Sequence, residues 1–198
     1  YGLADGWKPE LAPQESSPNI LDRWIISKLC SLVQGIDGAL SSYHLYAAAQ
    51  PILDFIDQLT NWYIRLNRRR FWSENKLEQD SDKLQAYATL HRVLLSFVRV
   101  LAPLAPFISE EIFLNLSRGV KEIECDSVHL TRFPEIEEFV GATIDCELEE
   151  AMDYFEDVIE LGRSIRSEQN IRGRQPLNCL TIIHPKREVL DRVATLEN

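Results

Sequence analysis

Arginines gathered in two short stretches are the residues of this chain best suited to contact another molecule. The first stretch runs Asn61-Trp-Tyr-Ile-Arg-Leu-Asn-Arg-Arg-Arg-Phe-Trp72. On a helix that turns about 100° per residue, five of its polar and aromatic side chains share one side. These are Asn61, Arg65, Arg68, Arg69 and Trp72. Guanidinium groups fork onto phosphate or stack on bases, and an indole ring stacks on a base, so this set suits single-stranded RNA.

The same arginines could instead form a solvated helix face that pairs with nearby carboxylates. The candidates for that pairing are Asp54, Asp57 and Glu74. Runs of charge are often surfaces of this kind, so the residue types alone leave both interpretations open. Arg70 differs from its neighbours because it falls on the opposite, apolar side of the helix. We therefore expect Arg70 to be a structural ion-pair or hydrogen-bond partner inside a helical bundle.

The second arginine stretch ends a later helix and continues into a loop. Its members are Arg163, Arg166, Arg172 and Arg174. These side chains could contact an RNA backbone, or they could bind carbonyl groups at the negative end of the helix. Physical chemistry alone does not choose between the two roles.

The overall charge is negative, which at first argues against a polyanionic ligand. The chain has 21 Lys and Arg residues against 31 Asp and Glu residues, a net charge of −10. Residues 135–157 hold ten carboxylates and no Lys or Arg, so the remaining residues sum to zero. A local basic patch in that neutral remainder can bind phosphate. No apolar run approaches the roughly 18 residues that cross a bilayer, so we expect no membrane partner.

Metal ligands and catalytic groups do not occur at diagnostic spacings. The cysteines and histidines are scattered: Cys30, Cys125, Cys146, Cys179, His44, His91, His129 and His184. No Cys-x-x-Cys pair and no Glu-x-x-His motif is present, so we predict no zinc or di-iron site and expect reduced thiols. Because the nucleophile elbow and the Gly-rich phosphate loop are also missing, we predict no catalytic residues and no cofactor in this chain.

Helical periodicity dominates the elements that would position these residues. We predict a helix from the Asn19 cap to about Ser42, a second over 44–72 with an early kink at Pro51, and a third that ends at Leu101. A short helix through 110–116 and a long one over about 145–169 follow, which makes the fold an all-α antiparallel helical bundle. The second helix should bury Ile52, Phe55, Ile56, Leu59, Tyr63 and Leu66, and the long one Leu148, Met152, Phe155, Val158, Ile159 and Ile165.

A small α/β C-terminal extension is also predicted, because Leu180-Thr-Ile-Ile-His184 is apolar and β-branched and lies between two prolines. A lone strand leaves its backbone groups unpaired, so it should either pair with the one extended candidate, 128–133, or form a poorly ordered tail. The chain begins with Tyr1 and not with Met, so we expect it to be a piece of a longer protein.

Several segments, taken in order, resemble one family. The strings LDRWIISKL, NWYIRLNRRRFW and LAPLAPFISEEIF, together with Ser127-Val-His-Leu and Ile171-Arg-Gly-Arg-Gln-Pro-Leu177, are similar to those of the isoleucyl-tRNA synthetases, which are class I aminoacyl-tRNA synthetases. The resemblance covers nearly the whole chain up to His184. It implies a lead-in from the catalytic domain over 1–18, a helical anticodon-binding bundle of the class Ia type over 19–143, and a long helix with an incomplete α/β junction subdomain over 144–198.

The resemblance also implies a function, namely recognition of the anticodon stem-loop of isoleucine-accepting tRNA. The residues expected to bind it are Asn61, Arg65, Arg68, Arg69, Trp72, Arg172 and Arg174. The parent would be a cytoplasmic isoleucine-tRNA ligase that uses ATP with magnesium. The family's HIGH and KMSKS motifs are missing here, so this piece should bind tRNA and the rest of the synthetase without catalysing. The alternative from a different class is a helical protein-interaction or scaffold module, whose arginines would pair with an acidic partner.

Overall fold

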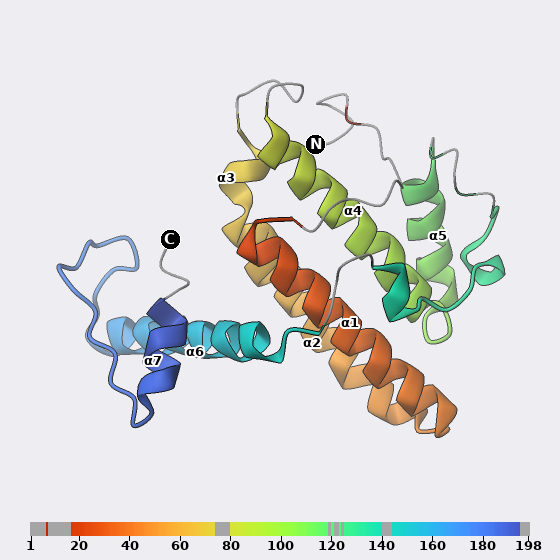
Figure 1. Ribbon diagram of the computed structural model, residues 1–198. Helices are drawn as coiled ribbons and strands as arrows, with labels where there is room; N and C mark the ends of the chain where they lie inside the picture. The colour runs from red at the N-terminus through yellow and green to blue at the C-terminus, as the bar shows by residue number, and fades with distance from the viewer. Residues whose placement is uncertain are drawn as a thin grey trace. The chain divides into compact units, whose positions relative to one another are not determined.

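The chain forms two helical units in the computed structural model, which describes residues 7, 17–73, 80–118, 120, 123, 125–139 and 144–194 (Figure 1). One unit is Tyr1–Ile144 and the other is Asp145–Asn198. The described residues contain helices and no strand, so the predicted all-α bundle is confirmed. None of the described helices is long and apolar enough to cross a membrane.

Helix α1 (Ile20–Ser41) begins where the sequence predicts, because the Asn19 side chain accepts a hydrogen bond of 2.9 Å from the backbone N–H of Leu21. Its apolar stripe buries Trp24, Ile25 and Leu29 completely. Burial of such a stripe against neighbouring helices is what stabilises a helix of this kind. Helix α1 therefore forms one wall of the core in the first unit.

The chain returns antiparallel to α1 in several pieces rather than as the predicted continuous helix over 44–72 (Figure 1). The pieces are a 3-10 turn η1 (Leu45–Ala48), α2 (Ala49–Asp57), a π-helical segment η2 (Gln58–Ile64) and α3 (Arg68–Phe71). A turn at Asn67, with φ −80° and ψ 6°, separates the last two. A π-helical segment closes its hydrogen bonds one residue later than an α-helix, so residues beyond it are rotated relative to a straight α-helix.

That rotation explains why the predicted apolar face of this segment is wrong beyond η2. Ile52, Phe55, Leu59 and Tyr63 are buried, as expected. Leu66, which follows the π-helical segment, is 39% exposed instead of buried, and Ile56 at the margin of the stripe is 38% exposed.

Helices α4 (Ser81–Leu101) and α5 (Pro106–Ser117) complete the first unit. The Asp80 carboxylate accepts a hydrogen bond of 3.0 Å from the backbone N–H of Lys83 and so caps α4. The predicted proline break is confirmed, because α4 ends at Leu101 and α5 begins with Pro106, whose missing N–H costs nothing in the first helical turn. Both α1 and α5 pack against α4.

The connection after α5 contains a 3-10 turn where an extended segment was expected. Val128–Leu130 forms this turn, η4, so the predicted extended segment at 128–133 is wrong over its first three residues. Val128 is buried in a cluster with Val98 and Phe113, and its backbone N–H donates to a Glu110 carboxylate oxygen over 2.9 Å. These contacts dock the connection onto α4 and α5. A second 3-10 turn, η5 (Ile136–Glu138), is held to α4 by an ion pair of 2.6 Å between Arg99 and Glu138.

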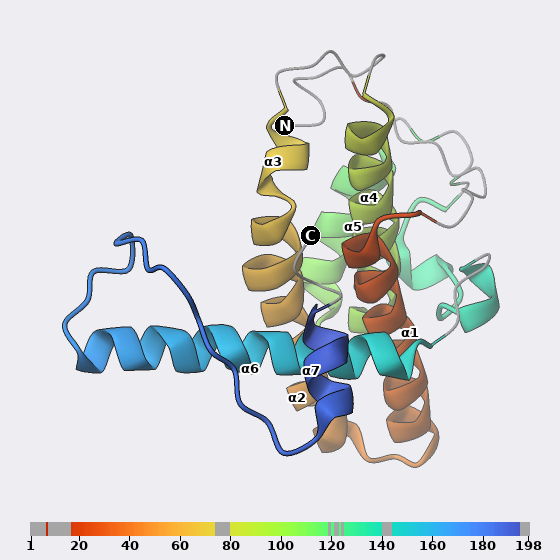
Figure 2. The same ribbon diagram turned by 60° about the vertical axis from the view of Figure 1, so that its left-hand side comes forward.

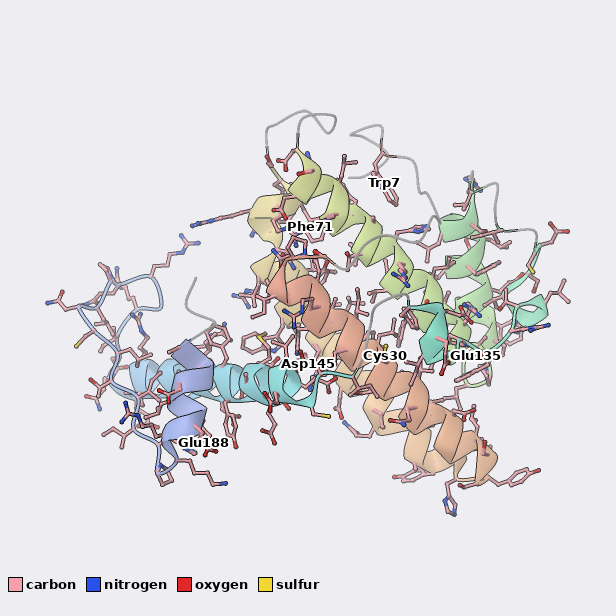
Figure 3. All side chains as sticks on the ribbon, in the orientation of Figure 1. Trp7, Cys30, Phe71, Glu135, Asp145 and Glu188 are labelled. Carbon is pink, nitrogen blue, oxygen red and sulfur yellow. The ribbon has the colours of Figure 1, made fainter. Side chains whose placement is uncertain are left out.

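Only three residues of the expected lead-in over 1–18 lie within the described residues: Trp7, Ser17 and Pro18. The indole of Trp7, labelled in Figure 3, lies 5.4 Å from the His91 ring and 6.0 Å from the Tyr87 ring of α4. The lead-in is therefore in contact with the bundle at this point.

The second unit consists of α6 (Cys146–Glu168), an irregular loop, and α7 (Arg187–Ala194), which packs against α6 (Figure 2). The long helix starts where the sequence predicts, with Asp145 as its cap: the Asp145 carboxylate accepts a hydrogen bond of 3.1 Å from the backbone N–H of Leu148. Leu148 and Met152 are buried, but Ile165, expected to be buried, is 57% exposed. Three more residues expected to be buried, Phe155, Val158 and Ile159, are half-buried, so the cover of the apolar stripe of α6 decreases towards its C-terminal end.

The strand predicted at 180–184 does not form. This segment is irregular, with Leu180 65% and Ile183 90% exposed, so the predicted α/β character of the extension is wrong for the described residues. The physical reason is the missing ladder partner, since the one internal candidate forms the η4 turn. β-branched residues favour a strand only where a neighbouring strand can pair with it.

The end of α1 yields a prediction about stability. Tyr43 has φ 56° in a Schellman turn, in which the backbone N–H groups of Tyr43 and His44 donate to the carbonyls of Leu40 and Ala39. A non-glycine residue pays about 1 kcal/mol or more in this left-handed conformation. Because Tyr43 is 89% exposed, Tyr43→Gly loses little packing, so we expect a gain of about 0.5–1 kcal/mol in urea unfolding.

Asn170 supplies the matched control, because it has φ 54° in the equivalent turn after α6. Asparagine tolerates this conformation, so Asn170→Gly should change stability less than Tyr43→Gly does. Equal effects at the two positions would contradict the role assigned to strain at Tyr43.

Candidate nucleic-acid interface

Four of the residues predicted to contact RNA meet at one open surface pocket of the first unit. Arg65, Arg68, Arg69 and Trp72 line it together with Leu66. All five side chains are exposed and come from the segment that directly follows η2 and runs through α3 to Trp72. The turn at Asn67 brings residues on its two sides to the same pocket, which is called the arginine pocket below.

Arg68 and Trp72 are stacked at the arginine pocket. The guanidinium carbon of Arg68 lies 4.4 Å from the centroid of the Trp72 ring, which is cation–π geometry. The stack holds a planar cation and a planar ring one helical turn apart. Trp72 keeps 42% of its surface exposed, so part of this aromatic residue is open to solvent beside several positive charges.

Asn61 is exposed on η2 but does not line the arginine pocket. Its side-chain amide donates to the Asp57 carboxylate over 2.5 Å. Asp54, another carboxylate that could have paired with the arginines, accepts instead from Gln50 over 2.7 Å. Glu74 lies outside the described residues. Among the carboxylates that the structure does describe, none forms an ion pair with Arg65, Arg68 or Arg69.

Arg70 points away from the arginine pocket, into the bundle, as its helical position predicts. Its two terminal nitrogens donate to the two oxygens of Asp22 over 2.8 and 2.9 Å. Asp22 belongs to α1 and is completely buried. On the other side, Arg70 bonds to both oxygens of Asp82 at the start of α4, over 2.7 and 2.9 Å. The prediction of a structural ion pair is confirmed.

Three more side chains complete the network around Asp22. The hydroxyl groups of Tyr63 and Ser17 each donate to one of its oxygens over 2.7 Å. The Asn67 side-chain oxygen accepts from Arg70 over 2.9 Å, while its amide nitrogen donates to the Tyr63 carbonyl over 3.0 Å. Every oxygen of the buried carboxylate is therefore bonded, which is the condition for a stable buried charge.

The charge states within this network follow from burial and from its members. Burial, the Asp22 charge and the hydrogen bond to Asp22 raise the pKa of Tyr63 well above its ordinary value, so its hydroxyl stays a donor. Burial disfavours the charged form of Arg70, but its hydrogen bonds and ion pairs with Asp22 and Asp82 outweigh that cost and raise its pKa. Arg70 is consequently a permanent cation.

Sequence periodicity missed Asp22, although a signal was present. Asp22 falls on the same stripe as Ile25, Leu29 and Ile36, all of which are buried. A carboxylate within an apolar stripe requires a buried partner, and Arg70, the arginine on the apolar side of its own helix, was the candidate.

The second arginine stretch lies in the other unit. Arg172 and Arg174 are exposed in the loop that follows α6. The Arg166 guanidinium donates to the carbonyls of Arg172, Gly173 and Gln175 over 3.1, 3.0 and 2.8 Å. Arg166 thus orders the loop, while the side chains of Arg172 and Arg174 face solvent. Among the described residues, no group of three His, Cys, Asp or Glu side chains could hold a metal ion.

Comparison with known proteins identifies what this chain is similar to. Residues 22–182 match the family described as the anticodon-binding domain of tRNA ligase. Isoleucine–tRNA ligase of Clostridium tetani is 44% identical over 182 residues, and that of Clostridium novyi 41%, each match covering 92% of this chain and 17% of the relative. The cytoplasmic isoleucine–tRNA ligase of Saccharomyces cerevisiae is 39% identical over 189 residues, 92% of this chain and 17% of the yeast protein. The chain therefore spans about a sixth of the length of these relatives.

Removal of the Asp22–Arg70 ion pair should cause a large loss in the free energy of unfolding. Arg70→Ala leaves a fully buried carboxylate without its counter-charge, and breaking a buried ion pair in this way costs about 3–5 kcal/mol. Urea denaturation followed by circular dichroism measures the loss. Arg69→Ala is the control, because this neighbouring arginine is exposed and its replacement should change stability by about 0.5 kcal/mol or less. Similar losses in the two variants would contradict the network's role.

Proposed function

Because the chain belongs to the anticodon-binding domain family of tRNA ligases, we propose that it binds the anticodon stem and loop of isoleucine-accepting tRNA. The observation that carries this proposal is the arginine pocket, where three exposed guanidinium groups and an indole meet without an ion pair to a described carboxylate. An anticodon loop offers closely spaced phosphates and unpaired bases, which are the groups that such a surface binds.

Each residue of the pocket has a distinct part in the proposed complex. The exposed face of the Trp72 ring, backed by Arg68, provides a platform on which a base of the loop can stack. Arg65 and Arg69 neutralise phosphates next to that base. Asn61, which lies one helical turn before Arg65, can donate to a base edge or a ribose if it releases Asp57.

The loop of the second unit is proposed to add contacts to the RNA backbone. Arg172 and Arg174 are exposed there, and Arg166 has already ordered the loop that carries them. An ordered loop loses little conformational entropy on binding, so its phosphate contacts are worth more than those of a flexible tail. These two arginines act through charge and would not distinguish one base from another.

The parent protein is proposed to be an isoleucine–tRNA ligase of the cytoplasm that attaches isoleucine to its tRNA with ATP and magnesium. In that protein, this domain would grip the far end of the tRNA and so help to orient the acceptor end, with the remainder of the synthetase as its second partner. The residues present here do not fit ATP, because the chain has no Gly-rich phosphate loop and lacks the family's nucleotide-binding motifs. We therefore propose that this part of the protein binds and does not catalyse.

We expect the triple substitution of Arg65, Arg68 and Arg69 by Ala to weaken tRNA binding and to flatten its salt dependence. Each phosphate that a protein neutralises contributes about 0.7–0.9 to the slope of log affinity against log salt, so losing the phosphate contacts of Arg65 and Arg69 should lower the slope by about 1.4–1.8. Fluorescence anisotropy of labelled tRNA over a salt series measures both quantities.

A variant with the same change of charge serves as the control. Arg118, Arg132 and Lys186 are exposed and lie outside the arginine pocket, so their joint replacement by Ala should leave the slope nearly unchanged. If both triple variants behave alike, the arginines act only through net charge. If neither differs from the original chain and an unrelated polyanion competes as well as tRNA does, the scaffold interpretation is favoured instead.

Amino-acid activation by this chain is expected to be absent. In an assay of isoleucine-dependent exchange of pyrophosphate into ATP, the 198-residue chain should give background counts, while a full-length isoleucine–tRNA ligase gives a strong signal. Exchange above background in a preparation shown to contain no host synthetase would contradict the assignment of a purely binding role.

A further inference from the structure

A fully buried negative charge lies behind the surface proposed to bind a polyanion. Asp22 bonds to Arg70, and Arg70 directly follows Arg68 and Arg69 of the arginine pocket. Through-space electrostatics alone would make Asp22 a hindrance to RNA binding. The geometry of α3 indicates instead that Asp22 favours RNA binding.

Helix α3 is too short for its own backbone hydrogen bonds to fix its orientation. It has four residues and follows the turn at Asn67, whereas isolated helices shorter than about 12 residues are marginal in water. Its orientation must therefore come from tertiary contacts. These contacts include the bonds from Arg70 to Asp22 and Asp82, the hydrogen bond of 3.2 Å from the Tyr87 hydroxyl to the Phe71 carbonyl, and the packing of the Phe71 ring against Tyr63 and Tyr87.

The contacts of Arg70 set the rotation of this short helix. At about 100° per residue, turning Arg70 inward places Arg68 and Trp72 on the opposite side, within about 40° of each other. That is the pair found stacked at 4.4 Å. A carboxylate on α1 and another on α4 hold Arg70 from two directions, so its guanidinium can neither swing nor slide without losing a bond.

We infer that Asp22 and Asp82 are positioning residues for tRNA binding: they hold Arg70 inward and thereby keep Arg68, Arg69 and Trp72 aimed at the RNA. The inference rests on the proposed function of the arginine pocket. Neither carboxylate touches the RNA. Each increases affinity for a negative ligand although it is itself negative.

This role can be separated from simple electrostatics because the two predict opposite signs. Replacing Asp22 or Asp82 by Asn removes one negative charge, which by charge alone leaves binding unchanged or makes it tighter. Loss of positioning makes binding weaker. We expect Asp22→Asn and Asp82→Asn each to lower tRNA affinity about tenfold, as when one charge-assisted contact is lost, and to reduce the salt slope.

Asp37→Asn is the matched control, because Asp37 is an exposed carboxylate on the same helix as Asp22 and its replacement changes the charge equally. It should bind tRNA as well as the original chain or slightly better. Binding by Asp22→Asn and Asp82→Asn that equals binding by Asp37→Asn would overturn the inference. Because the Asp82 side chain is 56% exposed, its replacement is compatible with folding. If Asp22→Asn does not fold, the Asp82→Asn variant tests the inference by itself.

Two further measurements distinguish positioning from a general loss of stability. Val98→Ala cuts the cluster between α4 and α5, so it should lower the melting temperature without changing tRNA affinity. In the folded Asp82→Asn variant, amide hydrogen exchange should become faster in residues 68–72. It should stay unchanged in α5 and in the part of α4 that follows the substituted residue. Unchanged exchange in 68–72 would overturn the inference.

A different pattern of tRNA binding among the variants is expected if the proposed function itself is wrong. If the original chain does not bind tRNA, or if the Arg65, Arg68 and Arg69 triple variant binds as tightly as the original, the proposed function fails and the inference fails with it. If the triple variant is weakened while Asp22→Asn and Asp82→Asn are not, only the positioning role is wrong.

Discussion

The buried ion pair between Asp22 and Arg70 is the constraint on which the arrangement of the first unit depends. A carboxylate with no solvent exposure is tolerated only when its lone pairs are bonded and its charge is balanced. Asp22 meets that condition through two bonds from Arg70 and one each from Tyr63 and Ser17. Because these donors come from three separate segments, satisfying one carboxylate requires those segments to meet at one point. When Arg70 reaches that point, Arg68 and Arg69 on the same short helix face solvent.

Local rather than overall charge explains how an acidic chain can present a surface for RNA. The net charge of −10 equals the charge of residues 135–157, whose ten carboxylates belong to η5, the beginning of α6 and the connection between them. The arginine pocket lies on residues 65–72, after η2, and its guanidinium groups form no ion pair with a described carboxylate. A local group of positive charges of this kind can bind phosphate although the whole chain is acidic.

Irregular backbone also shapes this surface. The return segment contains a π-helical stretch and a turn at Asn67 where a single helix was expected. An amphipathic pattern that assumes 100° per residue holds on either side of such interruptions but not across them. This is why Asn61, on the predicted face, does not line the arginine pocket, whereas Leu66, predicted to be buried, does. Asn67 itself is almost fully buried, and the burial of its polar amide is tolerated because the amide bonds to both Tyr63 and Arg70.

The amino-acid sequence alone determined the features that depend on neighbouring residues: the Asn19 cap, the start of the long helix near 145, the break before Pro106, the helical class, and the opposite directions of Arg70 and Arg68. Its motifs also indicated the family. Only the tertiary structure decided features that depend on distant partners. The carboxylates that hold Arg70 lie 48 and 12 residues away, and no local pattern specifies such pairs. Likewise, the apolar segment 180–184 and Ile165 carried the pattern of buried residues but are exposed among the described residues, because burial requires a partner surface that a residue's own sequence cannot supply.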